Sequence, residues 1–248
     1  MGDRIFYFFT GWFIVGFILV PLDLVPPWLE WANSVFLIAA GVVAVTYFIH
    51  IYKKKAGLFY SALVFTVSIS VEQFGVQSGF LFGSYEYTAR FGIKILDTPI
   101  TIGFAWLLVM GCADVIARGI VRHSRFLLAT VGALVAVTMD LILDPVAFQV
   151  KEYWIWGEGG LYYDIPSQNF LGWFILAFLF QSVLGLFSHH PVSVWQTRMS
   201  LVFLGMIAMF SVTAFAGGLL LAPILVLVLG AFWYTLFKRK KARHEIPE

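Results

Sequence analysis

Apolar stretches long enough to cross a membrane follow one another along almost the whole chain. Short segments with polar, Gly or Pro residues separate them. Because a helix needs about 20 apolar residues to cross the hydrocarbon core of a bilayer, each stretch predicts one transmembrane helix. We expect eight helices, near residues 5–25, 32–52, 58–79, 98–119, 126–146, 169–188, 199–217 and 221–237.

The separation between the last two stretches is the weakest. Gly217, Gly218 and Pro223 are the only turn signals between them. Seven spans, one of them a long broken helix, are therefore the alternative.

Composition agrees with this pattern. The chain is 60% apolar and only 12% charged, whereas soluble proteins have about 25% charged residues. No segment resembles a soluble domain, so the predicted fold class is all-α, a polytopic integral membrane helical bundle forming a single domain over residues 1–248. The first apolar run lacks an Ala-x-Ala-like cleavage site and is expected to be a retained span.

Most of the basic residues lie at alternate ends of the spans, and these residues predict the orientation. They are Arg4, Lys53 to Lys55, Arg118, Arg122, Arg125, Arg198 and the tail from Lys238 to Arg243. Under the positive-inside rule they belong in the cytoplasm. We therefore expect a multi-pass protein of the plasma membrane with both termini cytoplasmic and the connections 22–31, 80–97 and 147–168 outside. No basic patch is interleaved with stacking aromatics, so no nucleic-acid partner is predicted.

Three acidic residues lie within or beside the apolar segments. Asp140 and Asp144 are four residues apart and share one helix face, close enough to share a proton, and Pro145 ends or kinks that helix. Glu72 enters the third span. An Asp at the bilayer centre costs roughly 2.5 to 3.5 kcal/mol, so such residues usually face a protein interior and mark functional sites.

Other polar residues have simpler interpretations. Asp97 is predicted to cap the fourth span, and Asp114 is predicted to pair with Arg118 one helical turn away. Asn169, at the start of the sixth span, either caps its helix or places an amide in a pocket. The aromatic loop 153–163 is, taken alone, typical of a membrane interface; combined with the acids on the same side, it could instead cover a long apolar cavity with rings able to face a cation.

Several ordered motifs resemble a known family. They are Glu72-x-x-Gly75, Phe82-Gly83-x-Tyr85-x-Tyr87, Pro99-Ile100, Asp140-x-x-x-Asp144-Pro145, Trp154-x-Trp156-Gly157, Tyr162-Tyr163-x-Ile165-Pro166 and Asn169-Phe170-x-Gly172-Trp173. The pattern, over residues 60–190, is similar to the carotenoid biosynthesis membrane proteins that include bisanhydrobacterioruberin hydratase and bacterial carotenoid 1,2-hydratases. The resemblance implies cofactor-free hydration of the terminal isopropylidene double bond of an acyclic carotenoid.

The chemistry of this reaction can also be argued from the residues. Adding water to an unactivated alkene needs a strong general acid, a brief tertiary cation and a base that orients water. Burial favours the protonated form of a carboxyl group, and a neighbouring carboxylate favours it further. One of Glu72, Asp140 and Asp144 could therefore stay protonated near neutral pH while another stays ionised. A desolvated contact between the cation and an aromatic face is worth about 2 kcal/mol or more.

The candidate site therefore has two groups of residues. The predicted catalytic residues are Glu72, Asp140 and Asp144, and the predicted substrate-binding residues are Tyr85, Tyr87, Trp154, Trp156, Tyr162, Tyr163, Asn169 and Trp173. The expected partners are a lipophilic carotenoid, water and the lipid bilayer. Other carotenoid enzymes are further candidate partners. No cofactor or metal is predicted.

Other functions remain open from the sequence. A lycopene cyclase-like isomerase shares the first protonation step, and a non-enzymatic lipid- or pigment-binding or proton-coupled transport protein would also use intramembrane acids. A metal-dependent membrane hydrolase ranks last, because Cys112 is the only cysteine and the five histidines form no H-x-x-x-H or H-E-x-x-H pattern.

Overall fold

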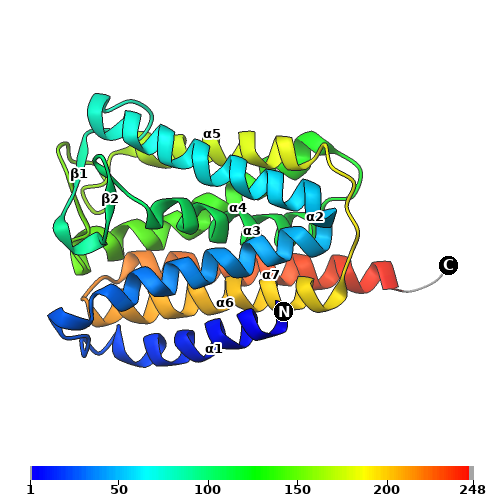
Figure 1. The fold of residues 1–248 in the computed structure, drawn as a ribbon, viewed down its shortest axis with the longest axis horizontal. Helices are drawn as coiled ribbons and strands as arrows, with labels where there is room; N and C mark the ends of the chain where they lie inside the picture. Colours follow the sequence, from blue (N-terminus) through cyan, green and yellow to red (C-terminus); the bar gives the residue numbers. More distant parts are fainter. Residues whose placement is uncertain (1, 246–248) are drawn as a thin grey trace.

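Seven helices that are long and apolar enough to cross a membrane run alongside one another in the computed structural model, which describes residues 2–245 (Figure 1). The helices are α1 (Gly2–Leu19), α2 (Trp31–Ser78), α3 (Thr101–Ile120), α4 (Arg125–Pro145), α5 (Ser167–Leu184), α6 (Ser193–Ala216) and α7 (Leu221–Glu245). The predicted all-α polytopic membrane bundle is confirmed.

Helix α2 contains two of the predicted spans. As one straight helix its 48 residues would extend about 72 Å, more than twice the roughly 30 Å hydrocarbon core. Lys53 interrupts it with φ 66° and ψ 158°, and the chain reverses direction there (Figure 1). A Cβ at Gly57 would lie 2.6 Å from the backbone of Phe48, so only glycine lets the two legs approach this closely.

The boundary between the last two helices is also resolved. Helix α6 ends at Ala216 and α7 begins at Leu221. The predicted alternative, in which these two segments form one broken helix, is therefore wrong. Across residues 2–245 the chain has eight membrane-length segments, because the two legs of α2 correspond to the second and third predicted spans.

The two ends of the bundle differ in character. The start of α1, the bend at Lys53, the α3–α4 connection and the end of α7 lie at one end, which we call the basic end (Figure 1). The connections 20–30, 79–100 and 146–166 lie at the other. This arrangement matches the predicted alternation of basic residues. That the basic end faces the cytoplasm stays a prediction.

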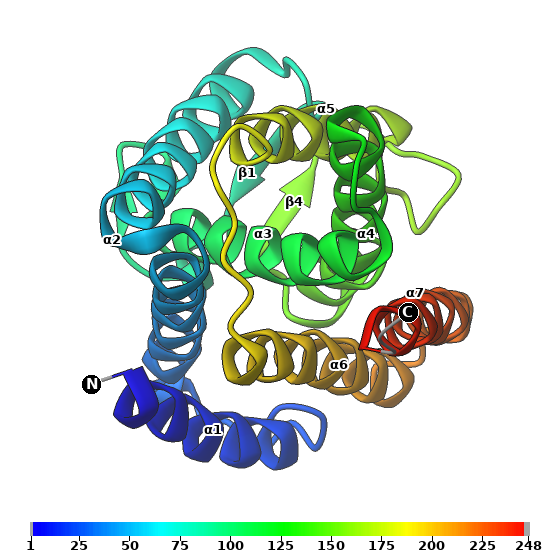
Figure 2. The same cartoon turned by 90° about the vertical axis from the view of Figure 1, so that its right-hand side faces the viewer.

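An antiparallel ribbon covers part of the end opposite the basic end. Strands β1 (Tyr85–Tyr87) and β4 (Trp154–Trp156) pair, with Tyr85 opposite Trp156 and Tyr87 opposite Trp154. Seen along the bundle, the ribbon lies behind the space that α2, α3, α4 and α5 surround (Figure 2). We call this end of the molecule the ribbon end.

Short elements complete the connections. They are the 3-10 turns η1 (Pro27–Leu29) and η2 (Ala89–Phe91), the π-helical segment η3 (Val146–Val150), and the paired strands β2 (Lys94–Ile95) and β3 (Thr98–Pro99).

The start of α3 corrects one prediction. Strand β3 precedes α3, which begins at Thr101 and has no side-chain cap. The Asp97 carboxylate instead accepts a hydrogen bond from the Gln73 side chain at 2.9 Å. The predicted cap at Asp97 is therefore wrong, because residues 98–99 are extended and the helix begins later.

Candidate active site

Asp140 and Asp144 lie near the end of α4, and both are buried, with 0% and 3% of their surface exposed. Four residues of helix place them on one face. Pro145 follows, and the chain continues as the π-helical segment η3, an irregularity often found at functional sites.

One amide serves both aspartates. The Asn169 Nδ2 donates to Asp140 Oδ2 at 3.1 Å and also to Asp144 Oδ2. Helix α5 begins at Ser167, and Pro166 precedes it as the N-cap residue. Of the two predicted alternatives for Asn169, the structure therefore supports the amide in a pocket.

Glu72, on the second leg of α2, has a fuller set of donors. Its Oε2 accepts hydrogen bonds from the hydroxyls of Tyr85 and Tyr87, the latter at 3.0 Å, and its Oε1 accepts from Trp106 Nε1 at 3.3 Å. Burial, together with the nearby Glu72 charge, holds the pKa of both tyrosine hydroxyls well above the usual range. Both hydroxyls therefore keep their protons and can donate to Glu72.

The alternation of the ribbon explains how it reaches Glu72. Successive strand residues point to opposite faces, so Tyr85 and Tyr87 are buried while Glu86 between them is exposed. The Tyr85 ring lies 5.1 Å from that of Trp156, and the Tyr87 ring lies 5.9 Å from that of Trp154, measured between centroids. One face of the ribbon thus presents four aromatic rings to the helices.

A glycine brings α5 close to the loop before the ribbon. A Cβ at Gly172 would lie 2.5 Å from the carbonyl oxygen of Leu81, so no larger residue fits without displacing the loop. The next residue, Trp173, stacks on Trp106 with ring centroids 4.2 Å apart. This packing fixes Trp106, which in turn donates to Glu72.

These groups meet at a single cavity of about 590 Å³, a volume typical of small-molecule sites. Its lining includes the three acids, Asn169, Trp106, Trp173 and the four ribbon aromatics, and otherwise consists mostly of apolar side chains from α1, α2 and α6. The cavity therefore joins a small acidic region to a long hydrocarbon-like one.

Several polar atoms at this cavity lack protein partners. Asp140 Oδ1 and the indole nitrogens of Trp154 and Trp156 are buried without a hydrogen bond to any described residue. No salt bridge found among the described side chains involves Glu72, Asp140 or Asp144. Buried polar groups are normally satisfied, so these atoms are available to a substrate or to water.

Tyr162 and Tyr163 are placed differently from the other predicted residues. The Tyr162 hydroxyl donates to the Leu141 carbonyl at 2.7 Å, and the Tyr163 hydroxyl accepts from the Ala222 N–H at 3.0 Å. Neither is among the described residues that line the cavity. These hydrogen bonds attach the loop that contains both tyrosines to α4 and α7. The structure gives no support to their predicted contact with substrate.

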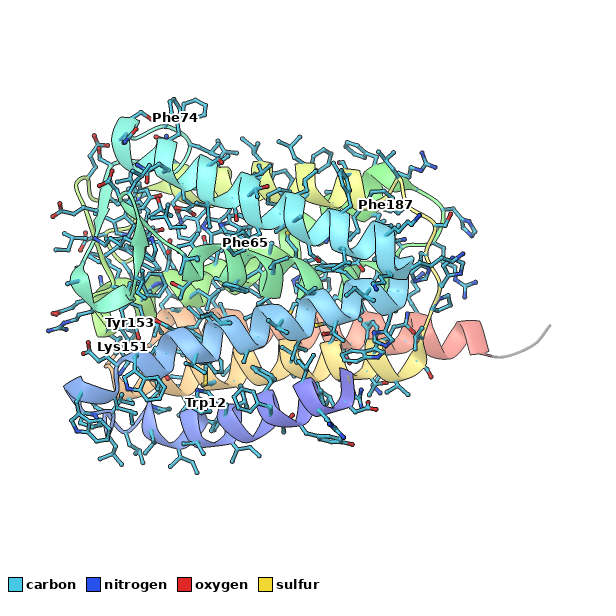
Figure 3. The ribbon with its side chains drawn as sticks, in the orientation of Figure 1. Trp12, Phe65, Phe74, Lys151, Tyr153 and Phe187 are labelled. Carbon is cyan, nitrogen blue, oxygen red and sulfur yellow. The ribbon has the colours of Figure 1, made fainter. Side chains whose placement is uncertain are left out.

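Trp106 and Lys151 are among the cavity residues that were missed from the sequence. Trp106 resembles any aromatic residue of a buried membrane helix, and no sequence signal singles it out. Lys151 lines the cavity at the ribbon end, where Figure 3 shows it near Tyr153. A lysine beside an acid cluster on the side predicted to be poor in basic residues is a signal that could have identified it.

Comparison with known proteins identifies the family. Searches of curated proteins and of solved structures give no match. The model of one family, described as carotenoid biosynthesis protein, matches residues 32–236. That range contains every predicted site residue, from Glu72 to Trp173, and most of the chain. The chain therefore belongs to the carotenoid biosynthesis protein family and takes part in carotenoid biosynthesis.

Proposed function

We propose that the protein is a carotenoid hydratase, which adds water across the terminal isopropylidene double bond of an acyclic carotenoid to give a tertiary alcohol. The observation that carries the proposal is the contrast between two carboxyl sites at one apolar cavity. Glu72 has three hydrogen-bond donors, whereas Asp140 and Asp144 share one amide. A proton donor and an anion can therefore be held side by side.

The aspartate pair is the proposed acid. An ionised carboxylate only accepts hydrogen bonds, while a carboxylic acid brings one O–H donor of its own. Two buried carboxylates with one shared donor, and with no ion-pair partner among the described residues, would be costly, and a proton on the pair removes one charge. This proton passes to the terminal alkene carbon, forms a C–H bond and leaves the positive charge on the tertiary carbon.

Glu72 and the ribbon are proposed to stabilise that cation. Three donors make Glu72 suited to remain an anion, and the rings of Tyr85, Tyr87 and Trp156 offer faces to a positive charge. Water then forms the new C–O bond and gives its second proton to a carboxylate. Exchange with solvent returns a proton to the aspartate pair, so the cycle needs no oxidant or reductant.

The ribbon also supports a position for the attacking water. The indole N–H groups of Trp154 and Trp156 line the cavity and have no acceptor among the described residues. A water molecule that accepts from one of these N–H groups keeps its second lone pair free to attack the cation. A buried water typically makes two to four hydrogen bonds, and Glu72 or the aspartates would accept its protons.

Turnover of lycopene, an acyclic carotenoid with two isopropylidene ends, in heavy-oxygen water tests the proposal. The purified protein should yield a product heavier by one water, with the heavy oxygen in its hydroxyl, without added nicotinamide, flavin or metal and without dioxygen. An isomer of unchanged mass would indicate cyclisation. Heavy oxygen that arrives only from labelled dioxygen would eliminate the carboxyl mechanism.

We further propose that the basic end faces the cytoplasm of the plasma membrane, as the positive-inside rule predicts. The acid site then lies in the outer half of the bilayer. A reporter fused after Glu248 should read as cytoplasmic, and an extracellular signal would reverse the orientation.

A further inference from the structure

Helix α1 stands apart from the rest of the bundle. Only 6% of the residues in its membrane-spanning stretch are buried, against 78% in that of α3, and it lies at the edge of the molecule (Figure 2). It also lies outside residues 32–236, the range that matches the family. One face of α1 packs against the core through Phe9 and Phe13, whose rings contact Phe36 of α2, and most of its remaining surface does not contact the bundle.

One face of α1 nevertheless forms a wall of the cavity. The lining positions begin at Tyr7 and end at Leu19, and they recur at helical spacing through Gly11, Val15 and Gly16. At 1.5 Å per residue this wall is about 18 Å long. Trp12 lies on the same wall, and its indole donates to the Ala32 carbonyl of α2 at 3.2 Å (Figure 3).

The wall contains two glycines among larger apolar residues and is open at its side. A Cβ added to Gly11 or to Gly16 would meet nothing within 4 Å. Gly11 is exposed, and so are its neighbours on the wall, Phe8 at 55% and Val15 at 56%. Because these positions lie within a membrane-spanning helix, the cavity opens laterally towards lipid.

Contacts at both ends hold α1 in this position. Near the basic end, Arg198 of α6 forms a salt bridge with Asp3 at 2.6 Å. At the ribbon end, Lys151 donates to the Val20 carbonyl at 3.2 Å, just after α1 ends. In the middle of the helix, Phe9 and Phe13 pack against Phe36, and the face that carries the two glycines borders the cavity.

We propose that this face of α1 forms a groove for the extended polyene chain of the carotenoid, with Gly11 and Gly16 as the residues that admit it. The inference rests on the proposed function. A polyene is a stiff apolar rod, which suits a straight apolar wall in the same cavity as a buried acid with an unpartnered oxygen, Asp140 Oδ1. The terminal double bond reaches the acids, and the rest of the chain leaves sideways into the bilayer.

Filling the groove tests this assignment. Gly11→Phe and Gly16→Phe place a ring in the cavity without losing helix propensity, while Ile14→Phe and Ile18→Phe add a similar ring at exposed α1 positions outside the cavity lining. Binding of lycopene to purified protein in lipid nanodiscs is followed by the shift of its absorption band. The glycine variants should bind at least about tenfold more weakly, and the isoleucine variants should bind normally. Normal binding by folded glycine variants would overturn the groove.

A second measurement covers the case in which a phenylalanine variant does not fold. Cys112 is buried, so Gly11→Cys and Ile14→Cys each introduce one accessible thiol for a small maleimide. Lycopene should slow the labelling of Gly11→Cys several-fold and leave that of Ile14→Cys unchanged. Equal labelling of Gly11→Cys with and without lycopene would mean that lipid or nothing occupies the groove, which overturns the assignment.

These readouts separate the groove from the proposed reaction, since neither requires turnover. If lycopene binding depends on Gly11 but no water is added to it, the groove stands and hydration fails. If water is added and Gly11 has no effect on binding or protection, hydration stands and the groove fails.

Discussion

Asp114, towards the basic end, and the paired acids of α4, towards the ribbon end, are both buried in membrane-spanning helices, but their surroundings differ. Asp114 accepts hydrogen bonds from Tyr47 at 2.8 Å, from Tyr52 at 2.8 Å and from Arg118 Nε at 3.0 Å. Arg118 also neutralises its charge, which confirms the predicted ion pair. Asp114 is not among the described residues that line the cavity.

The paired acids have the opposite arrangement. Asp140 and Asp144 share the amide of Asn169, no cation contacts them in the described structure, and they line the cavity. A buried charge with all its partners in place holds helices together, whereas a buried carboxyl that lacks partners is costly to the fold. Glu72 has hydrogen-bond donors but, like the aspartate pair, no ion-pair partner among the described residues, and it lines the same cavity. The comparison therefore suggests that pairing with a cation away from the cavity separates the structural acid from the functional acids in this bundle.

The largest expected effect is on stability, at Asp114. Replacing it with Ala leaves Arg118 and two tyrosine hydroxyls without their acceptor, and breaking a buried pair in this way costs about 3 to 5 kcal/mol. We expect a large fall in the unfolding midpoint of Asp114→Ala, measured thermally in detergent, and unchanged turnover in the protein that remains folded.

The matched control removes both charges. Asp114→Ala combined with Arg118→Met leaves no unpaired ion and should recover much of the loss. An Asp114→Ala protein as stable as the parent would contradict the structural role, and the contrast between the two sites would then lose its basis.

The next effect is on turnover, at the paired acids. Asp140→Asn and Asp144→Asn keep the shape of each side chain but remove the proton and the charge, so each should lower turnover at least about a hundredfold. Glu72→Gln should behave alike. Product formation from lycopene by purified protein measures the rate, and the unfolding midpoint serves as the control for folding. Near-normal rates would show that these carboxyls are structural.

The sequence predicted much of this architecture because the membrane imposes simple rules. Helix lengths, the alternation of basic residues and the shared face of Asp140 and Asp144 all follow from periodicity and hydropathy. The reversal within α2 follows from the same rules, since the charged run that begins at Lys53 divides two apolar stretches, each long enough to cross the bilayer.

The ribbon was harder to predict. Its two strands are about 70 residues apart, and their register decides that Tyr85 and Tyr87 face Glu72. The alternations Tyr-Glu-Tyr and Trp-Ile-Trp are strand signals, but three residues are too few to establish a pairing. Trp106 and the cavity face of α1 depend on tertiary packing alone, which no local pattern shows.

A smaller effect on turnover is expected at Tyr85 and Tyr87, whose hydroxyls position the Glu72 carboxylate. A hydrogen bond to a charged group is worth about 1.5 to 3 kcal/mol, and each 1.4 kcal/mol corresponds to about a tenfold change in rate. Tyr85→Phe should therefore lower turnover by roughly tenfold and keep the aromatic ring of the ribbon in place.

Tyr87→Phe tests whether the two hydroxyls act on the same group. The double variant should lose less than the product of the single effects, because both hydroxyls donate to the same Glu72 oxygen. With Glu72→Gln as the background, either tyrosine substitution should have little further effect. Undiminished effects in that background would show that the tyrosines act independently of Glu72.

The smallest expected effect is at Tyr162, which the structure fastens to α4 away from the cavity lining. Tyr162→Phe removes one hydrogen bond to the Leu141 carbonyl, so stability should fall by about 0.5 to 1.5 kcal/mol and turnover should remain close to that of the parent. Unfolding midpoints and lycopene turnover are measured in parallel for Tyr162→Phe and Tyr85→Phe. This compares directly two tyrosines that the sequence alone did not distinguish. In the present structure the Tyr162 hydroxyl donates to the backbone of α4. A large loss of turnover at unchanged stability would therefore contradict this purely structural role and would indicate that Tyr162 contacts the substrate after a movement of the loop.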